Sequence, residues 1–391
     1  MSQVKAIKQF AQMQLFVFGI KSMALIILCA KSGVPGKRVC CLACCCVISC
    51  CCYTIRSNRG SIITLSNRLF CLALLIFFSL GCQPRAGLST PISTAPSAVV
   101  TVLGQREYFV QQQLTLVNEG PGQPEKQNIW VALIRDFSPY QEVMSMEISP
   151  PDYELIVDEY GNHYAEFDFS KHPPGTNKTI QIDYRVIVYD LTYNLSICEG
   201  GLPDEFTQPE LHIESANPQI ASLASELSLG KNTVCQQVRA FYDYVGNELT
   251  YSYNGNSWGA QAALGSMGAD CTEYTSLLVA LSRSQDIPAR YFEGLLYIEN
   301  KTDAIARTEH AWPDVYMPGV GWVPLDPTLG RSPVNRENYF AHYISDHLII
   351  TMGPNPSTLR GSNYWTHLYW PGNSTKIYVE AEEWKIESLV K

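Results

Sequence analysis

Cysteine and charge divide this chain of 391 residues into two unlike parts at Cys82. Eleven of the 14 cysteines lie at or before that residue, and residues 1–81 carry nine Lys or Arg but no Asp or Glu. The part after Cys82 holds three cysteines, and it contains 19 basic and 37 acidic residues. Because the two parts differ so strongly in composition, we expect the folded body to lie after Cys82.

Composition limits what that body can be. Apolar residues make up 46% of the chain, enough for a real core, and charged residues (17%) are too few for a disordered protein. The length allows two ordinary domains plus extensions. The excess of acidic over basic residues after Cys82 argues against nucleic-acid binding, which needs a basic surface.

The stretch before Cys82 has the pattern of a targeting signal. Arg68 precedes an apolar run over 69–80, and the small residue Gly81 precedes Cys82. These marks predict a secretory signal at 61–81. The run is shorter than the roughly 20 residues that span a bilayer. A cysteine directly after Gly81 resembles a bacterial lipoprotein signal, in which Cys82 is the lipidated residue. An ordinary signal peptide and a short uncleaved anchor are the alternatives.

The segments on either side of this signal, residues 1–60 and 82–99, show no pattern of a folded domain. Residues 82–99 are rich in Pro, Ser, Thr and Ala, which predicts a flexible tether that holds a domain off a membrane. Residues 1–60 carry a dense cysteine cluster, but no His precedes His163 to complete a zinc site. Palmitoylation of this cluster and a translation start near 62–68 are alternatives. We assign residues 1–60 no function.

Residues 100–205 predict a β-sandwich domain. Short apolar or alternating runs are separated by Gly- and Pro-rich turns, without a long helical period. The expected strands lie at 108–117, 128–134, 164–169 and 179–189. We expect this module to position or recognise a ligand rather than to catalyse.

Residues 206–391 predict a second domain that mixes helices and strands. A helical stretch over 220–249, interrupted near 229–231, precedes Cys271. Behind Cys271 a helix is indicated by an apolar stripe at helical spacing, formed by Tyr274, Leu277, Leu278 and Leu281. That helix must end before Pro288.

Cys271 falls at the start of this helix, with Asp270 as the expected N-cap. The helix dipole and the unpaired backbone N–H groups of a first turn favour an anion. We therefore expect a lowered thiol pKa and a reactive thiolate. The same N–H groups are candidate donors to an oxyanion.

Two further residues complete a chemical set. His310 opens an expected strand that runs to residue 316, and a turn at 318–321 leads into a return strand at 322–325. Asp326 follows directly, so the hairpin brings His310 and Asp326 together. A thiol, an imidazole and a carboxylate are the parts of a thiol acyl-transfer site.

The motifs around these residues resemble the transglutaminase-like superfamily. They are Gly-x-x-Cys-x-x-Tyr with the following Ile-Pro-Ala-Arg, then His-Ala-Trp-x-x-Val-Tyr, then Gly-Trp-x-x-x-Asp-Pro-Thr, in order over 220–330. The resemblance implies an α+β fold with a papain-like core, in which the helix that carries the cysteine packs on an antiparallel sheet. It assigns Cys271 as nucleophile, His310 as general base and acid, and Asp326 as the residue that orients His310. Pro313 departs from the family pattern and suggests an edge or bulged strand.

Other residues carry weaker expectations. Trp258 could supply an indole N–H near the oxyanion, as upstream aromatic residues do in some relatives, although packing is the commoner role of such a residue. Cys198 and Cys235 can pair in an exported protein and leave Cys271 free. His347, like the remaining histidines, has no recognisable partner pattern. The tail over 340–391 is expected to complete the second domain.

These features predict an exported, membrane-anchored thiol enzyme of the cell envelope. It would act on amide bonds of a protein or peptide substrate, with a cell-wall peptide as one option, through an acyl-thioester. Hydrolysis is favoured, since nothing in the sequence indicates an amine-binding subsite. A cross-linking transglutaminase is the alternative, and a non-catalytic surface binding module is the alternative of another class. No motif for a metal or other cofactor is present in the sequence, and no nucleic-acid partner is expected.

Overall fold

The computed structural model describes residues 16–20, 23–27, 29–31, 38–40, 98–253, 259–265, 268–299, 307–372 and 376–389. The chain divides into two compact units, Met1–Pro91 and Ile92–Lys391. In the first unit two short antiparallel pairs are described, β1 (Phe16–Ile20) with β2 (Met23–Ile27) and β3 (Cys29–Lys31) with β4 (Arg38–Cys40). The predicted signal at 61–81 and Cys82 lie outside the described residues.

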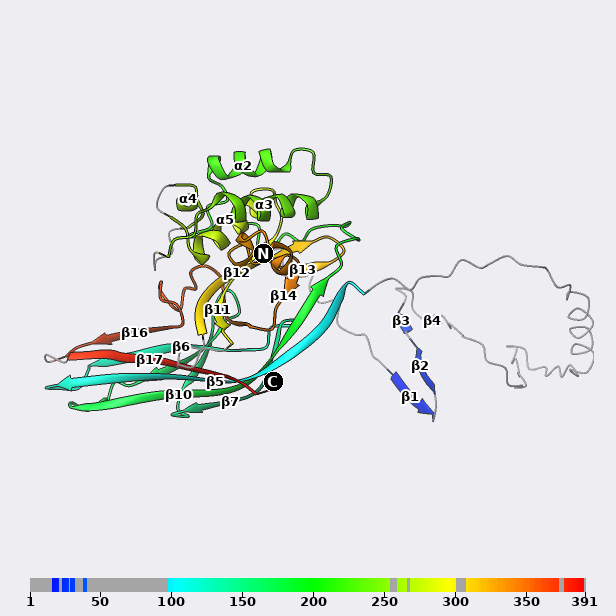
Figure 1. Cartoon of the computed structure of the whole chain (residues 1–391). Helices are drawn as coiled ribbons and strands as arrows, with labels where there is room; N and C mark the ends of the chain where they lie inside the picture. Colours follow the sequence, from blue (N-terminus) through cyan, green and yellow to red (C-terminus); the bar gives the residue numbers. More distant parts are fainter. Residues whose placement is uncertain are drawn as a thin grey trace, which may run out of the picture. The chain divides into compact units, whose positions relative to one another are not determined.

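Two long strands organise the β-rich part of the second unit. β5 (Val100–Gly120) and β10 (Thr176–Tyr193) pair antiparallel along nearly their whole lengths. Figure 1 shows them side by side in the lower part of the body. Three more strands extend this sheet: β7 (Gln141–Ser149), β14 (His342–Tyr343) and β17 (Lys376–Ser388). Burial alternates along β5, so one face of the sheet covers a core.

A second antiparallel sheet is formed in the same part of the chain. Its order is β16 (Trp365–Trp370), β6 (Lys126–Leu133), β9 (His163–Asp168) and β8 (Glu154–Val157). The four strands predicted between residues 100 and 205 are present as β5, β6, β9 and β10, and the structure adds β7 and β8. The packing of the two sheets as a sandwich stays a prediction.

The C-terminal strands depart from the sequence prediction. The expectation that the whole tail completes the second domain is wrong for β16 and β17, because they pair with β6 and β5 of the β-rich part. In Figure 1 the red β17 lies beside the cyan β5. A strand as long as β5 would otherwise expose an unpaired edge, which β17 covers. Residues 92–391 are accordingly one compact unit.

Helices occupy the segment before and around Cys271. They are α2 (Pro218–Ser228), α3 (Val234–Glu248), α4 (Ala260–Ala263) and α5 (Cys271–Arg283). The predicted interruption near 229–231 is confirmed, and Asn217 and Thr233 cap α2 and α3 with their side chains. None of the helices among the described residues is long and apolar enough to cross a membrane.

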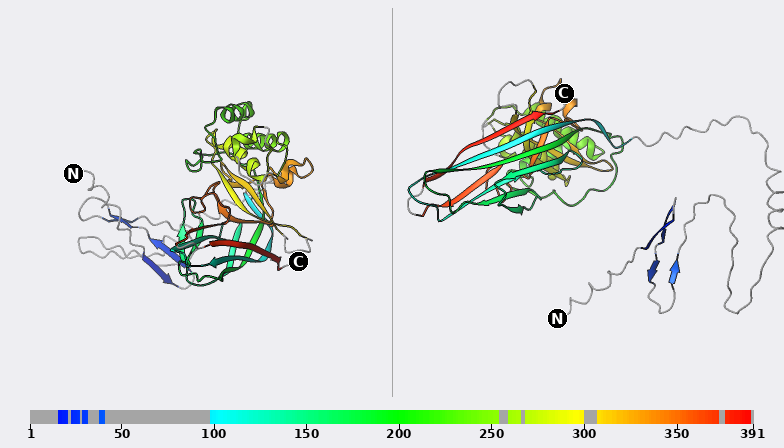
Figure 2. Two further views of the ribbon diagram at one scale, coloured as in Figure 1. Left: turned by 90° about the vertical axis from the view of Figure 1, so that its left-hand side faces the viewer. Right: turned by 90° about the horizontal axis from the view of Figure 1, so that it is seen from below.

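The helix that carries Cys271 lies against an antiparallel sheet. The sheet order is β13 (Gly321–Pro324), β12 (Arg307–Met317), β11 (Ala289–Tyr297) and β15 (His347–Met352). Residues 273–283 of α5 are all buried, so this helix is a core element rather than a surface one. Figure 2 shows the helices gathered over the yellow strands β11 and β12. Two short 3-10 turns follow β13, η1 (Leu329–Arg331) and η2 (Arg336–Tyr339).

Side-chain amides of the β-rich part cover the edge strand β15. Gln141 accepts from the Ile349 N–H (2.8 Å) and donates to its C=O (2.9 Å). Asn162 makes the same pair of bonds with Met352, both at 2.8 Å. Each side-chain amide therefore forms the pair of hydrogen bonds that a neighbouring strand would form, on the edge of β15 that does not pair with β11. This fixes β15, whose first residue is His347.

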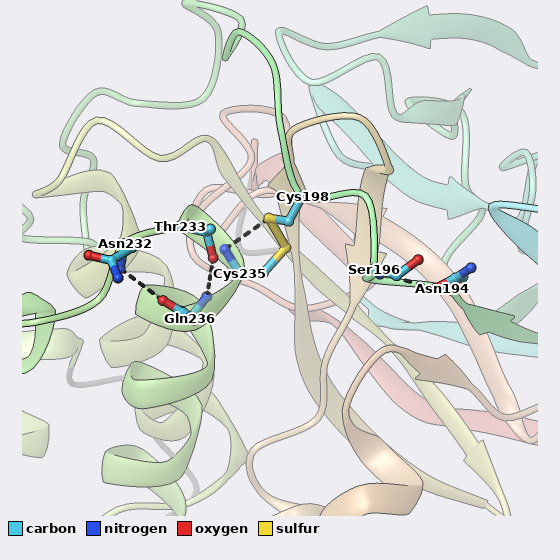
Figure 3. Close-up of a disulfide and its surroundings, with 7 residues drawn as sticks. All are labelled: Asn194, Ser196, Cys198, Asn232, Thr233, Cys235 and Gln236. Atoms are coloured by element: carbon cyan, nitrogen blue, oxygen red, sulfur yellow. Dashed lines mark hydrogen bonds between the residues drawn. A yellow bond between two sulfur atoms is a disulfide. The ribbon is translucent and has the colours of Figure 1, made fainter.

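A disulfide joins the segment after β10 to α3. It links Cys198 to Cys235, in the first turn of the helix, and the Cys235 N–H lies 3.1 Å from the Cys198 sulfur (Figure 3). The disulfide thus attaches the end of the β-rich part to the helices, while Cys271 is a free thiol.

Candidate active site

A capping box fixes where α5 begins. The Asp270 carboxylate accepts from the Thr272 N–H (3.1 Å), and the Glu273 carboxylate accepts from the Asp270 N–H (3.0 Å). The predicted N-cap is confirmed. Cys271 is therefore the first residue of the helix, and it is partly buried.

The Cys271 thiol lies beside the part of β12 that does not pair with β13. The pairing of β12 with β13 ends at Asp314 and Pro324. Beyond that point the Ala311 backbone N–H lies near enough to the Cys271 sulfur to lower the thiol pKa. Because Ala311 follows His310, this proximity places Cys271 beside the strand residue that carries the imidazole.

Pro313 lies at the same edge. The predicted edge position is confirmed locally, because the β12–β13 register ends at Asp314 although β12 lies between β11 and β13, and the β11–β12 register shows no bulge at Pro313. The Pro313 C=O accepts from the Leu325 N–H (3.0 Å), so the Pro313 nitrogen also faces the β13 side. Pro313 therefore removes no bond from the β11–β12 ladder.

His310 and Asp326 form a buried hydrogen-bonded pair. Nε2 of His310 lies 2.7 Å from Oδ2 of Asp326, and both side chains are about 4% exposed. The other carboxylate oxygen accepts from the Leu329 N–H (2.8 Å). The Trp312 ring stacks on the imidazole, with centroids 5.8 Å apart and planes 24° apart. These contacts fix the imidazole's orientation and leave Nδ1 for other partners.

His347 is a second imidazole on the same carboxylate, which the sequence analysis missed. Its Nε2 lies 3.2 Å from Oδ2 of Asp326, and its Nδ1 lies 2.6 Å from Oδ1 of Asp346. Only the dipeptide Asp346-His347 at the start of an apolar strand hints at this role. The contact with Asp326 arises from the pairing of β15 with β11, which no local pattern reveals.

Electrostatics at the thiol differ from the prediction. Burial raises the pKa of Cys271 to about 12, the Ala311 N–H opposes this, and the negative charges of Asp270, Asp326 and Glu293 raise it further. The expectation that the helix start lowers the pKa of the Cys271 thiol is therefore wrong. The cause is desolvation together with an acidic surrounding. Ionisation of Cys271 then depends on a nearby base.

The carboxylate of the pair stays ionised. Burial alone would raise the pKa of Asp326, but His310 and His347 outweigh it and hold that pKa well below its ordinary value. Asp326 is thus a permanent anion near neutral pH. It can only accept hydrogen bonds, which suits a residue that orients an imidazole and stabilises its protonated form.

A third carboxyl group lies near the thiol. Burial raises the pKa of Glu293 to about 7, against a hydrogen bond from Tyr291 that lowers it. The Tyr291 hydroxyl lies 3.3 Å from the carboxylate, and Glu293 pairs in register with Ala311. The sequence analysis did not single out Glu293, because its effect depends on burial.

The site residues also include the atoms that a metal ion would require. One nitrogen each from His310 and His347 and one oxygen of Asp326 lie within 4.8 Å of one another. These atoms already bond to each other, since Asp326 accepts from both rings. We therefore interpret the group as a charge-paired hydrogen-bond network, whose donors and acceptors an ion would have to displace.

Trp258, the candidate for an oxyanion donor, lies outside the described residues. Within the described first turn of α5, the cap accepts from the N–H groups of Thr272 and Glu273. Those two N–H groups are therefore not the oxyanion donors that the sequence suggested.

Comparison with known proteins shows similarity over the part of the chain that holds these residues. Residues 221–327 match the family model of the transglutaminase-like superfamily. The "Uncharacterized protein YebA" of Bacillus subtilis (strain 168) is 29% identical over 169 residues, which cover 38% of this chain and 23% of YebA. The chain thus corresponds to about a quarter of that relative.

Solved structures extend the similarity beyond the core. The crystal structure of a "Putative Cysteine Protease" from Cytophaga hutchinsonii matches with a TM-score of 0.52 at 16% identity, over 75% of this chain and 93% of that one. The periplasmic domain of TgpA from Pseudomonas aeruginosa matches with a TM-score of 0.32 at 16% identity, over 62% of this chain and 96% of that one. The Cytophaga protein therefore shares the fold over most of the body. Residues 221–327 of this chain are a transglutaminase-like core, and they contain Cys271, His310 and Asp326.

Proposed function

We propose that this protein is a cysteine acyl-transfer enzyme that hydrolyses amide bonds of a protein or peptide. His310 takes the proton of Cys271, and the thiolate attacks the amide carbon to form a tetrahedral oxyanion. The backbone N–H of Cys271 is the first-turn donor that the Asp270 cap does not use, and it is our candidate for stabilising the oxyanion. When the carbon–nitrogen bond breaks, His310 gives its proton to the leaving amine and an acyl-thioester remains.

The second half-reaction reverses these roles. His310 takes a proton from water, and the oxygen attacks the thioester carbon. The carbon–sulfur bond then breaks, a carboxylic acid leaves, and the thiol receives the proton back from His310. Throughout, Asp326 keeps the imidazole oriented and stabilises it while it is protonated.

One observation carries this proposal: His310 lies 2.7 Å from the buried, ionised Asp326, and the backbone N–H of the residue after His310 is near the Cys271 sulfur. A structural cysteine gains nothing from such a neighbour. Because burial raises the pKa of the thiol, the proposal requires an adjacent base to accept its proton, and we assign that role to His310.

The acceptor in the second step is tested by direct competition. The full chain is incubated with casein and a dansyl-labelled primary amine, with Cys271→Ala as the control. Peptide release without dansyl incorporation, lost in the control, is the expected result. Incorporation that depends on Cys271 would instead indicate a cross-linking transglutaminase. Neither product would favour a non-catalytic binding module.

We further propose that the protein is exported and anchored through a lipid on Cys82. The disulfide between Cys198 and Cys235 supports export, because disulfides persist in oxidising compartments. Cell fractionation tests the anchor. The Cys82→Ser variant should leave the membrane fraction, and retention of this variant in that fraction would contradict lipid anchoring.

A further inference from the structure

His347 and His310 bond to the same oxygen of Asp326. The distances to Oδ2 are 2.7 Å from Nε2 of His310 and 3.2 Å from Nε2 of His347. With the Leu329 N–H on Oδ1, three donors hold this carboxylate, so it has little freedom to rotate away from His310.

The bonds of His347 require a positive charge. Its Nε2 faces Asp326 and its Nδ1 faces Asp346 at 2.6 Å. An ionised carboxylate only accepts hydrogen bonds, so both ring nitrogens must donate, and the ring is an imidazolium. Burial works against this charge, but Asp346 and Asp326 together raise the pKa of His347 to about 9.

The surroundings of His347 are rigid. The ring is 3% exposed, the Trp312 ring meets it edge to face at 4.9 Å and 82°, and the Tyr343 hydroxyl donates to its backbone C=O (2.8 Å). The titratable groups that face it from all packed elements are Asp326, Asp346, His310, Tyr339 and Tyr343. Because both tyrosines hold their protons at neutral pH, the charges that matter are the two carboxylates and His310.

We propose that His347 is a positioning residue, which holds Asp326 in the orientation that His310 requires and supplies a second positive charge beside the thiol–imidazole pair. The ring centroids of the two imidazoles are 5.9 Å apart, so this charge acts on the pair directly. The inference rests on the proposed thiol chemistry.

The sign of its effect on the thiol can be stated. The acidic midpoint of thiol reactivity reports the loss of the Cys271 proton. A positive charge on His347 stabilises the thiolate, so its removal should move the acidic midpoint of thiol reactivity to higher pH. A residue that served only to fill space would lower reactivity without moving that midpoint.

The test is the rate of iodoacetamide alkylation of Cys271 in the full chain, measured between pH 4 and pH 8. We expect His347→Gln, which keeps one donor but no charge, to react at least about tenfold more slowly at pH 7 and to raise the acidic midpoint by about one pH unit. His347→Lys, which restores a charge, should recover most of the midpoint shift.

Two further variants complete the design. Asp346 is partly exposed, and Asp346→Asn should shift the midpoint in the same direction, because His347 then loses its proton more readily. The Asp346→Asn variant still measures the effect of the His347 charge if His347→Gln does not fold. The matched control is His342→Gln, which breaks another histidine–carboxylate pair, to Asp190 (2.7 Å), outside the site. It should leave the profile unchanged.

The outcomes separate this inference from the proposed function. If wild-type Cys271 reacts no faster than free cysteine, the proposed function fails. If it reacts rapidly, depends on His310, and keeps the same acidic midpoint in His347→Gln and Asp346→Asn, only the role of His347 is overturned.

Discussion

The Cys271 thiol owes its chemistry to its neighbours. Burial raises its pKa to about 12, so the thiol taken by itself keeps its proton at pH 7. A position at a helix start does not compensate, because the Asp270 cap adds a negative charge to the same turn. In the proposed mechanism reactivity therefore comes from proton transfer to His310, and residues that orient this imidazole or place a charge beside it contribute to it.

Asp326→Asn tests that orientation. An amide can present an N–H towards Nε2 of His310 and so favour the wrong tautomer. We expect kcat for casein hydrolysis to fall on the order of 10³- to 10⁴-fold, with little change in KM, as loss of an orienting carboxylate does in comparable triads. A loss of less than tenfold would mean that Asp326 is not the orienting residue.

His347 makes a prediction about stability. Its folded pKa of about 9 lies above the ordinary 6.5, so its contribution is fully present below about pH 6.5 and is lost as pH rises to about 9. The free energy of unfolding of the wild type should therefore exceed that of His347→Gln most at pH 6 and least at pH 9.5. Urea titrations at the two pH values measure the difference, and an equal gap at both would contradict a charged His347.

The sequence predicted the three residues of the proposed triad because each lies in a local block with its own pattern. It could not predict His347, whose contact with Asp326 depends on the register of β15 against β11. It also gave the wrong direction for the pKa of Cys271. Helix position is visible in a sequence, whereas desolvation and the approach of Glu293 are not.

At the scale of elements, the start of α5 is the most consequential boundary. Asp270→Ala removes the N-cap and should lower the free energy of unfolding by about 0.5–2 kcal/mol. Asp270→Ser keeps a capping oxygen but removes the charge, so it should retain most of the stability. Urea denaturation of both variants gives the comparison, and equal stability of the two would show that the cap is unimportant.

Local patterns predicted elements well where burial follows a simple period. The apolar stripe behind Cys271 gave α5, and the Gly-rich turn gave the hairpin of β12 and β13. β12 nevertheless begins at Arg307 rather than at His310, because its pairing with β11 continues to Tyr297. β7 was missed although Met144, Met146 and Ile148 alternate with polar residues, and because Met144 and Met146 are exposed this alternation marks no core face.

At the scale of the whole molecule, side-chain hydrogen bonds join the β-rich part to the transglutaminase-like core, and we expect the two to depend on each other for folding. The amides of Gln141 and Asn162 cover β15, and the Tyr140 hydroxyl donates to Asp314 (3.0 Å) in β12. The sequence predicted two successive domains because hydrogen bonds between distant segments leave no local pattern. β16 and β17 pair with β6 and β5, so the C-terminal strands belong to the β-rich part.

Deletion of residues 363–391 tests this interdependence. It removes β16 and β17, exposes edges of β6 and β5, and should prevent cooperative folding of the β-rich part. Because that part covers β15, alkylation of Cys271 should also slow. Deletion of residues 390–391 is the control. A 363–391 deletion variant with a wild-type alkylation rate would show that the core folds independently.

The central claim, that Cys271 is a nucleophile activated by His310, is tested most directly by its alkylation rate at pH 7. Iodoacetamide should modify wild-type Cys271 faster than free cysteine, and His310→Ala should slow the reaction at least about tenfold, because the isolated thiol keeps its proton. A wild-type rate no faster than free cysteine, or an unchanged rate in His310→Ala, would contradict the account.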